Sequence, residues 1–288
     1  MEDTMRIVKT IKEVKGIVKE WRKEGKEIGL VPTMGYLHNG HRSLMERARK
    51  ENGKVVVSIF VNPIQFGPNE DFATYPRDLE HDKAVCESAG VDVIFAPEAE
   101  EMYQEGFCSF VGMSILTEEL CGKSRPSHFQ GVCTVVSKLF HIVTPDRAYF
   151  GQKDAQQLAV IKRMVIDLSM DVEVIGCPIV REEDGLAMSS RNTYLSEQER
   201  KAALILSESL QLADVLVKQG ETSAANVLEE MKKLIQLEPL AKIDYVEAVN
   251  VLTMKPVDTI TDSTLIAMAV YIGKTRLIDN RMMLGGKQ

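Results

Sequence analysis

The sequence predicts an α/β protein: a doubly wound, Rossmann-like parallel sheet domain over residues 1–183, followed by a smaller α+β C-terminal domain over residues 184–288. Short apolar runs without polar alternation, such as Val55–Val61, are typical of parallel strands buried on both faces. These runs alternate with helical patterns, the order expected of strands joined by crossover helices. Near residue 196 the pattern changes to two helical segments and then strand-like ones, which predicts the second domain.

The N-terminal part opens with apolar residues at helical spacing, which predicts an amphipathic helix over residues 6–24. The expected strands that follow cover residues 28–31, 55–61, 91–96, 147–150 and 172–177, and the expected helices cover 41–50, 79–89, 132–142 and 155–168. The connection 62–77 contains three prolines and a glycine. Loops of this length within compact domains are usually functional or mobile.

The C-terminal part begins with a capping box, Ser196-x-x-Glu199, which predicts a long helix that ends near Lys218. A second helix is expected from about Ser223 to Ile235. The expected strands cover residues 243–251, 265–271 and 276–278.

Composition limits the function classes. The formal net charge is −7 and the pI is about 5.4, which argues against general binding of nucleic acid or anionic membranes. The five cysteines include no C-x-x-C pair, a pattern that favours free thiols in a reducing cytoplasm over disulfides or a zinc site. The N-terminus has no signal-peptide pattern, and no apolar run is long enough to cross a bilayer. We expect a soluble cytoplasmic protein.

The segment Ile28–His41 is the first candidate site. A buried strand ends in a glycine turn, and His38 and His41 stand where the next helix begins. Backbone N–H groups and the positive end of the helix can bind an anion there, and imidazole donors can stabilise charge that develops on a phosphate. The alternative is two surface histidines near a helix cap. The strand and turn before the pair favour the anion site.

Asn62 and Gln65 directly follow the clearest strand, where ligands of open α/β sheets bind. Their amides suit the hydroxyls and carboxylate of a polar substrate. An Asn-Pro turn with a solvated glutamine is an equally good interpretation of the pattern alone.

The run Gly151–Asp154 also lies between a strand and a helix. Lys153 could contact a phosphate, and Asp154 could contact a ribose hydroxyl or a metal-bound water. Asp154 could also serve as the N-cap of the next helix, and the two roles are compatible.

Met188–Asn192 offers two hydroxyls and an arginine, which suit a triphosphate, in a segment that could close as a mobile loop. A solvated interdomain linker is the alternative. Arg125 and His128 lie in a basic loop that could form a flap over a site. Asp82 is a candidate metal contact, although a solvated helix carboxylate is the stronger interpretation of that residue alone.

Several motifs, in this order and spacing, resemble the pantothenate synthetase family over roughly residues 6–195. They are Pro32–Gly35 with His38–His41, Ser58–Phe66, Tyr75–Arg77, His128–Val132, Lys153 and Asp154 with Gln157, and Met188–Asn192. The resemblance implies an adenylate-forming ligase of the H-x-G-H nucleotidyltransferase superfamily. It would join pantoate to β-alanine through an enzyme-bound pantoyl adenylate and release pyrophosphate and AMP. Mg²⁺ accompanies ATP in the family, and members are usually homodimers.

The resemblance also implies roles for individual residues. The residues it places on ATP are Met34, Gly35, Tyr36, Leu37, His38, Asn39, Gly40, His41, Gly151, Gln152, Lys153, Asp154, Val180, Met188, Ser189, Ser190 and Arg191. Among these, His38, His41, Lys153, Ser189, Ser190 and Arg191 would act on the phosphate being transferred. Gln65 and Gln157 would hold pantoate with Asn62 nearby, Arg125 and His128 would form a flap, and Asp82 would be linked to the metal.

Three positions depart from the family pattern: Gln152, Asp78 and Ala155. None of these departures removes a group assigned to the chemistry. Two other functions stay open at this point. One is a different H-x-G-H nucleotidyltransferase that stops at the nucleotide adduct, and the other is a non-catalytic ATP sensor.

Overall fold

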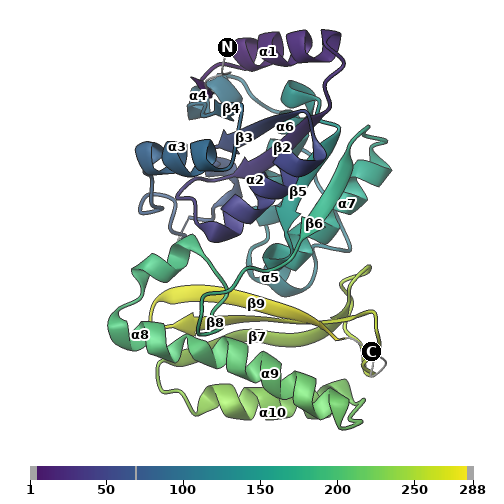
Figure 1. The fold of residues 1–288 in the computed structure, drawn as a ribbon. Coiled ribbons are helices and arrows are strands. Elements are labelled where there is room, and N and C mark those ends of the chain that lie inside the picture. Colours follow the sequence, from purple (N-terminus) through teal and green to yellow (C-terminus); the bar gives the residue numbers. More distant parts are fainter. Residues whose placement is uncertain (1–4, 69, 284–288) are drawn as a thin grey trace. The chain divides into compact units, whose positions relative to one another are not determined.

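The computed structural model describes residues 5–68 and 70–283, which fold into two compact units. The N-terminal unit consists of residues 5–113, 125–152 and 160–178, without residue 69. The C-terminal unit consists of residues 114–124, 153–159 and 179–283. Figure 1 shows the two sheets around which these units are built.

A six-stranded parallel sheet forms the centre of the N-terminal unit. Its order is β1-β4-β3-β2-β5-β6. The strands are β1 Arg6–Val8, β2 Ile28–Thr33, β3 Lys54–Ile59, β4 Val93–Phe95, β5 Arg147–Gly151 and β6 Glu173–Cys177. Strand order runs away from β2 in both directions, through β3 on one side and β5 on the other. This is the topological switch point beside which open α/β sheets bind ligands.

Helices lie between these strands along the chain. They are α1 Ile11–Lys23, α2 Asn39–Glu51, α3 Leu79–Ser88, α4 Ala99–Met102 and α6 His128–Val143, and α7 Ala155–Asp167 connects β5 to β6. Leu44 and Met45 of α2 pack with Val55 and Val57 of β3 in one core. Val56, which points to the opposite face, is also fully buried. Both faces of β3 are therefore covered, as its unbroken apolar run predicts.

The start of the chain differs from the sequence prediction. The expected helix over residues 6–24 begins only at Ile11, and Arg6–Val8 is the edge strand β1, paired with β4. Thr10 and Glu13 form a capping box that starts the helix. The sequence contains this capping box as T-x-x-E. Ile7 fits the helical spacing of the residues that follow, so the spacing alone places the start of the helix too early.

The C-terminal unit carries an antiparallel sheet of order β7-β8-β9, formed by Ala241–Asn250, Thr264–Ile272 and Thr275–Met283. Its helices are α5 Leu120–Ser124, α8 Glu197–Ala202, α9 Leu204–Lys218 and α10 Ala224–Gln236. The predicted capping box of Ser196 and Glu199 is present, but the expected long helix is divided at Ala203 into α8 and α9.

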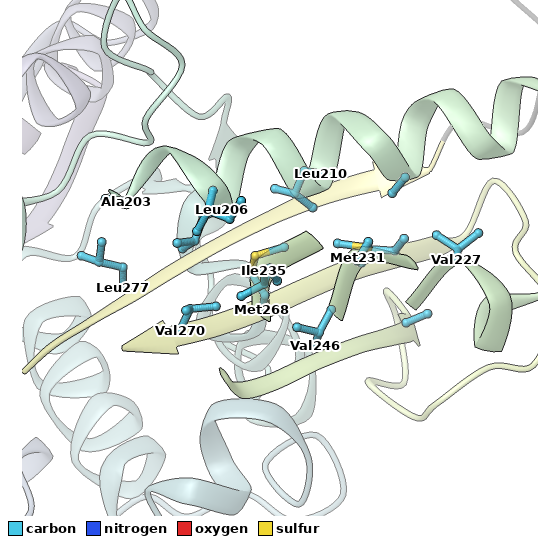
Figure 2. Close-up of a cluster of buried hydrophobic side chains, with 14 of the residues drawn as sticks. Ala203, Leu206, Leu210, Val227, Met231, Ile235, Val246, Met268, Val270 and Leu277 are labelled. Carbon is cyan, nitrogen blue, oxygen red and sulfur yellow. The ribbon is translucent and has the colours of Figure 1, made fainter. Parts of the chain in front are cut away.

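One apolar core joins α8, α9 and α10 to the sheet of this unit. Figure 2 shows it, with labelled side chains from α9, α10 and all three strands; these are Leu206, Leu210, Val227, Met231, Ile235, Val246, Met268, Val270 and Leu277. Within the described residues, every helix is too short or too polar to cross a bilayer.

Candidate active site

The carboxylate of Asp82 contacts the turn between β2 and α2. Gly35 and Tyr36 have φ angles of 85° and 51°, so two consecutive residues are left-handed. Asp82 of α3 accepts the N–H of Tyr36 on Oδ2 at 2.9 Å and the N–H of Leu37 on Oδ1 at 2.7 Å. His81 Nε2 lies 2.8 Å from the Leu37 carbonyl oxygen and donates to it, because a carbonyl can only accept.

Asp82 is buried, with a relative exposure of 1%. This burial excludes the alternative of a solvated helix carboxylate. Burial raises the pKa of Asp82, although its two backbone hydrogen bonds act in the opposite direction. A Cβ atom on Gly35 would lie 2.8 Å from Asp82 Oδ2, so the carboxylate and the turn fit only with glycine there.

His38 and His41 form the cap of α2. Nδ1 of His38 accepts the N–H of Gly40 at 3.1 Å, and Nδ1 of His41 accepts the N–H of His38 at 3.3 Å. The two ring centroids are 4.1 Å apart. Because both Nδ1 atoms accept, each neutral imidazole carries its proton on Nε2. The cap thus supplies two neutral N–H donors at the positive end of a helix.

Asn62 and Gln65 follow β3, and Gln65 belongs to the short helix η1 Pro63–Gln65. Asn62 Nδ2 donates to Gln65 Oε1 at 3.1 Å and to the Gly131 carbonyl at 3.1 Å. Gln65 Nε2 lies 3.0 Å from the sulfur of Met34, in the segment after β2. The structure therefore brings together the predicted residues that follow β2 and β3.

Arg125 and His128 contact the backbone of Gln65. His128 Nδ1 donates to the Gln65 carbonyl at 3.0 Å, and Arg125 Nη2 lies 3.5 Å from the same oxygen. Arg125 also forms a two-pronged ion pair with Glu70 in the 62–77 connection. Burial acts to raise the pKa of Glu70, but the Arg125 guanidinium outweighs it and holds that pKa below its usual value. These contacts favour a positioning role for both residues, and direct contact with substrate stays a prediction.

In the C-terminal unit, two side chains of β9 bond the segments that contain Lys153 and Arg181. Asn280 Nδ2 donates to the Lys153 carbonyl at 2.7 Å. The adjacent Asp279 forms a bidentate ion pair with Arg181, at 2.7 and 2.9 Å. Arg181 in turn donates to the Gly185 carbonyl at 3.0 Å, which ties the 181–187 turn to the sheet.

This turn leads directly into the Met188–Asn192 segment. The N–H of Met188 donates to the Val180 carbonyl at 3.0 Å. Ser189 caps the short helix η3 Ser190–Tyr194 and accepts the N–H of Arg191. Asn192 Nδ2 donates to the Ala187 carbonyl at 3.1 Å. The segment is thus a structured turn, which is more order than a solvated linker requires.

Two neighbouring glutamines on α7 differ in their surroundings. Gln156 is buried, and its amide bonds the backbone of Cys121, Leu116 and Glu119, so it serves the structure. Gln157 is only half-buried, so part of its side chain is accessible to a ligand. Of the remaining predicted residues, Gly151 and Gln152 belong to the N-terminal unit, and Asp154 and Val180 belong to the C-terminal unit.

Comparison with known proteins decides the family. The model of the family described as pantoate-beta-alanine ligase matches residues 6–282. The chain belongs to this family. The ligase is 64% identical to the pantothenate synthetase of Ruminiclostridium cellulolyticum over 276 residues, which cover 96% of this chain and 98% of that protein. It is 61% identical to the enzyme of Clostridium acetobutylicum over the same shares.

Solved structures agree. The crystal structure of pantothenate synthetase from Thermus thermophilus superposes with a TM-score of 0.93 at 48% identity, over 97% of this chain and 100% of that one. The pantoate-beta-alanine ligase from Francisella tularensis was solved with beta-gamma ATP and beta-alanine. It has a TM-score of 0.81 at 37% identity, over 97% and 98% of the two chains. The family and the fold class predicted from the sequence are both confirmed.

Some residues that contact the predicted site residues carry little or no signal in the sequence. Tyr103 donates to Asn62 Oδ1 at 2.7 Å, yet it is a lone tyrosine in an irregular segment with no motif around it. Asp279 and Asn280 are visible as an adjacent polar pair after an apolar run, but the predicted strand ends at residue 278. The predicted helix over residues 132–142 leaves Gly131 outside, whereas α6 begins at His128 and includes it.

The donor set around Asp82 does not fit a metal cage built by the protein. Both carboxylate oxygens already accept backbone N–H groups, and among residues 5–68 and 70–283 no three His, Cys, Asp or Glu side chains form a metal-binding cluster. Mg²⁺ commonly binds through substrate phosphates with only one or two carboxylates. The contacts favour a positioning role for Asp82, and its link to a metal stays a prediction.

Proposed function

We propose that this ligase condenses (R)-pantoate with β-alanine to form pantothenate, at the expense of ATP. In the first step a pantoate carboxylate oxygen attacks the α-phosphorus of ATP. The new P–O bond forms as the bond to the β-phosphate oxygen breaks, and pyrophosphate leaves. In the second step the β-alanine nitrogen attacks the acyl carbon of pantoyl adenylate. The C–N bond forms, the C–O bond to AMP breaks, and the amine loses a proton.

The capped histidine pair is the observation that carries this proposal. Adenylation develops negative charge on the phosphates without a covalent enzyme intermediate, so the protein must align the reactants and stabilise charge. His38 and His41 offer two Nε2–H donors at a helix N-terminus beside the sheet's switch point. Family membership supports the same reaction, as does the Francisella relative with beta-gamma ATP and beta-alanine.

The remaining roles are part of the proposal. Gln65 and Gln157 bind pantoate, and Lys153 with Ser189, Ser190 and Arg191 binds the transferred phosphate. The adenosine and phosphate contacts come from Met34–His41, Gly151–Asp154, Val180 and Met188. Mg²⁺ accompanies the ATP phosphates, and no step is assigned to it because the residues around Asp82 do not form a cage for it. The homodimer and the cytoplasmic location also stay predictions.

The test is a set of omission assays. With ATP and pantoate alone we expect one pyrophosphate per active site and little free AMP, and β-alanine should then allow turnover with one AMP per pantothenate. Pyrophosphate release that is independent of pantoate would favour a different nucleotidyltransferase. ATP binding without any pyrophosphate release would favour a sensor. Either result would contradict the proposal.

A further inference from the structure

Three side chains of the N-terminal unit form a hydrogen-bonded chain that ends beside Met34. Tyr103 Oη donates to Asn62 Oδ1 at 2.7 Å, Asn62 Nδ2 donates to Gln65 Oε1 at 3.1 Å, and Gln65 Nε2 lies 3.0 Å from the Met34 sulfur. Asn62 is 1% exposed and Gln65 is 8% exposed. The chain runs from the segment after α4, through the end of β3, to the turn that follows β2.

A backbone carbonyl determines the direction of this chain. The Gly131 oxygen, 3.1 Å from Asn62 Nδ2, can only accept, so that end of the Asn62 amide must be the nitrogen. The Asn62 oxygen therefore faces Tyr103, which must donate. The second hydrogen of Asn62 Nδ2 then goes to the Gln65 oxygen, and this leaves Gln65 with its NH₂ group toward Met34.

The ring of Tyr103 is well placed to hold its end of the chain. It packs against Phe60 and Phe107, with centroid distances of 6.1 and 4.9 Å. Burial raises the pKa of Tyr103, which favours the protonated hydroxyl that donates to Asn62. Asn62 has both amide atoms engaged in these bonds, and its contribution to binding passes through Gln65.

The contact at the far end of the chain is weak. A thioether sulfur is a poor hydrogen-bond acceptor. The Gln65 NH₂ group therefore loses only a weak hydrogen bond when a substrate oxygen replaces the Met34 sulfur. A carboxylate or hydroxyl oxygen gains this donor, whereas an amine presented at the same point meets a second donor. The fixed orientation thus selects a substrate that brings an oxygen acceptor.

We propose that Tyr103 is a positioning residue that fixes the Gln65 amide with its nitrogen toward the acid substrate, and so sets the affinity for pantoate. This inference rests on the proposed function, because it takes pantoate as the ligand of Gln65. Tyr103 acts through Asn62 and contacts no substrate itself. Without the Tyr103 hydroxyl, Asn62 Oδ1 loses this donor while Nδ2 keeps its bonds to Gly131 and Gln65, so the Asn62 side chain is held less firmly and with it the Gln65 amide.

The first experiment compares two tyrosine variants. Tyr103→Phe removes the hydroxyl but keeps the ring, and we expect the KM for pantoate to rise about 10-fold with the KM for ATP unchanged. Tyr149→Phe is the control, because its hydroxyl also bonds two side chains, Glu51 and Asn52, in the same unit. It should leave the KM for pantoate within about 2-fold of wild type. An equal rise in both variants, or none in Tyr103→Phe, would overturn the proposal.

The second experiment separates positioning from general support of the fold. In an Asn62→Ala background, Tyr103→Phe should change the KM for pantoate by less than about 2-fold, because the connecting amide is gone. Full additivity of the two substitutions would refute the relay. If the wild-type enzyme shows no pantoate-dependent pyrophosphate release, the proposed function itself fails; if it does and Tyr103→Phe matches it, only the relay fails.

Discussion

Oδ1 of Asp82 lies 2.7 Å from the backbone nitrogen of Leu37, and this contact joins α3 to the turn that precedes the histidine pair. The turn contains two left-handed residues, one of which is the non-glycine Tyr36. A left-handed L-residue costs about 1–2 kcal/mol. The hydrogen bonds to the Asp82 carboxylate offset part of that cost. They hold the turn that leads directly into His38.

Asp82→Asn replaces one acceptor oxygen by an NH₂ group that faces a backbone N–H. We expect kcat/KM to fall by about 10-fold or more, the scale of a lost hydrogen bond to a charged group. Stability at neutral pH should change little, because the variant also removes a buried charge whose pKa burial raises. Steady-state kinetics and thermal melting measure the two effects separately. Equal losses of activity and stability would contradict a positioning role.

The same pKa shift predicts a pH dependence. Because the folded pKa of Asp82 lies above the ordinary value of about 3.9, the folded state binds this proton more tightly than the unfolded chain. The resulting stability is present below that ordinary value and is lost as pH rises through the folded pKa. Urea unfolding of wild type and Asp82→Asn across this window should therefore show a steeper decline with pH in wild type.

The sequence predicts the junction after β2 but not what holds it. Strand, glycine turn and histidine spacing are local patterns, and the structure has them where the sequence places them. Asp82 meets Leu37 across 45 residues, and helical spacing alone does not tell which carboxylate of α3 turns inward. Tyr103 reaches Asn62 across 41 residues. Contacts of this kind depend on how elements pack, so no single segment contains the signal.

Variants of the histidine pair can separate its contribution to stability from its contribution to the rate of adenylate formation. His38→Ala should slow adenylate formation by about 10²-fold, the loss expected for one charge-stabilising donor. It should also cost about 1 kcal/mol of stability, because His38 is the N-cap of α2. His38→Asn keeps a capping oxygen but has no Nε2–H, so it should restore the stability and not the rate.

Single-turnover pyrophosphate release and thermal melting measure these two properties of the histidine variants. His41→Ala should be about as slow as His38→Ala. His141→Ala is the control, since His141 lies in the last turn of α6 and its Nδ1 bonds the Ser137 carbonyl of the same helix. A wild-type rate in His38→Ala and His41→Ala would exclude the pair from the chemistry.

Gly131 gives a steric prediction. A Cβ atom there would lie 2.5 Å from Gln65 Cα and 2.5 Å from the Ile64 carbonyl oxygen. Gly131→Ala should therefore displace η1, lower the stability by about 1–3 kcal/mol and raise the KM for pantoate. Gly16→Ala, in an exposed part of α1 with no atom within 4 Å, should stabilise by up to about 1 kcal/mol. If Gly131→Ala leaves both the stability and the KM for pantoate unchanged, η1 can move without affecting Gln65.

The ion pair of Arg181 and Asp279 supports the C-terminal unit. The Asp279 side chain is 1% exposed and that of Arg181 is 22% exposed, so removing one charge leaves the other poorly solvated. Asp279→Asn should lower the free energy of unfolding by about 3 kcal/mol, the lower end of the range for a broken buried pair. Urea unfolding checks this value against Asp214→Asn, which breaks the more exposed pair with Arg281 and should cost less than about 1 kcal/mol.

Asp279→Asn should also affect nucleotide binding. Arg181 ties the 181–187 turn to β9, and that turn leads directly into the Ser189–Arg191 segment proposed to bind phosphate. Loosening the turn spreads those side chains over more positions, so the KM for ATP should rise in Asp279→Asn and stay near wild type in Asp214→Asn. Loss of stability with an unchanged KM for ATP would mean that the ion pair serves the fold alone. The Ser189–Arg191 segment would then be held in place by the hydrogen bonds of Asn192 with Ala187 and of Met188 with Val180.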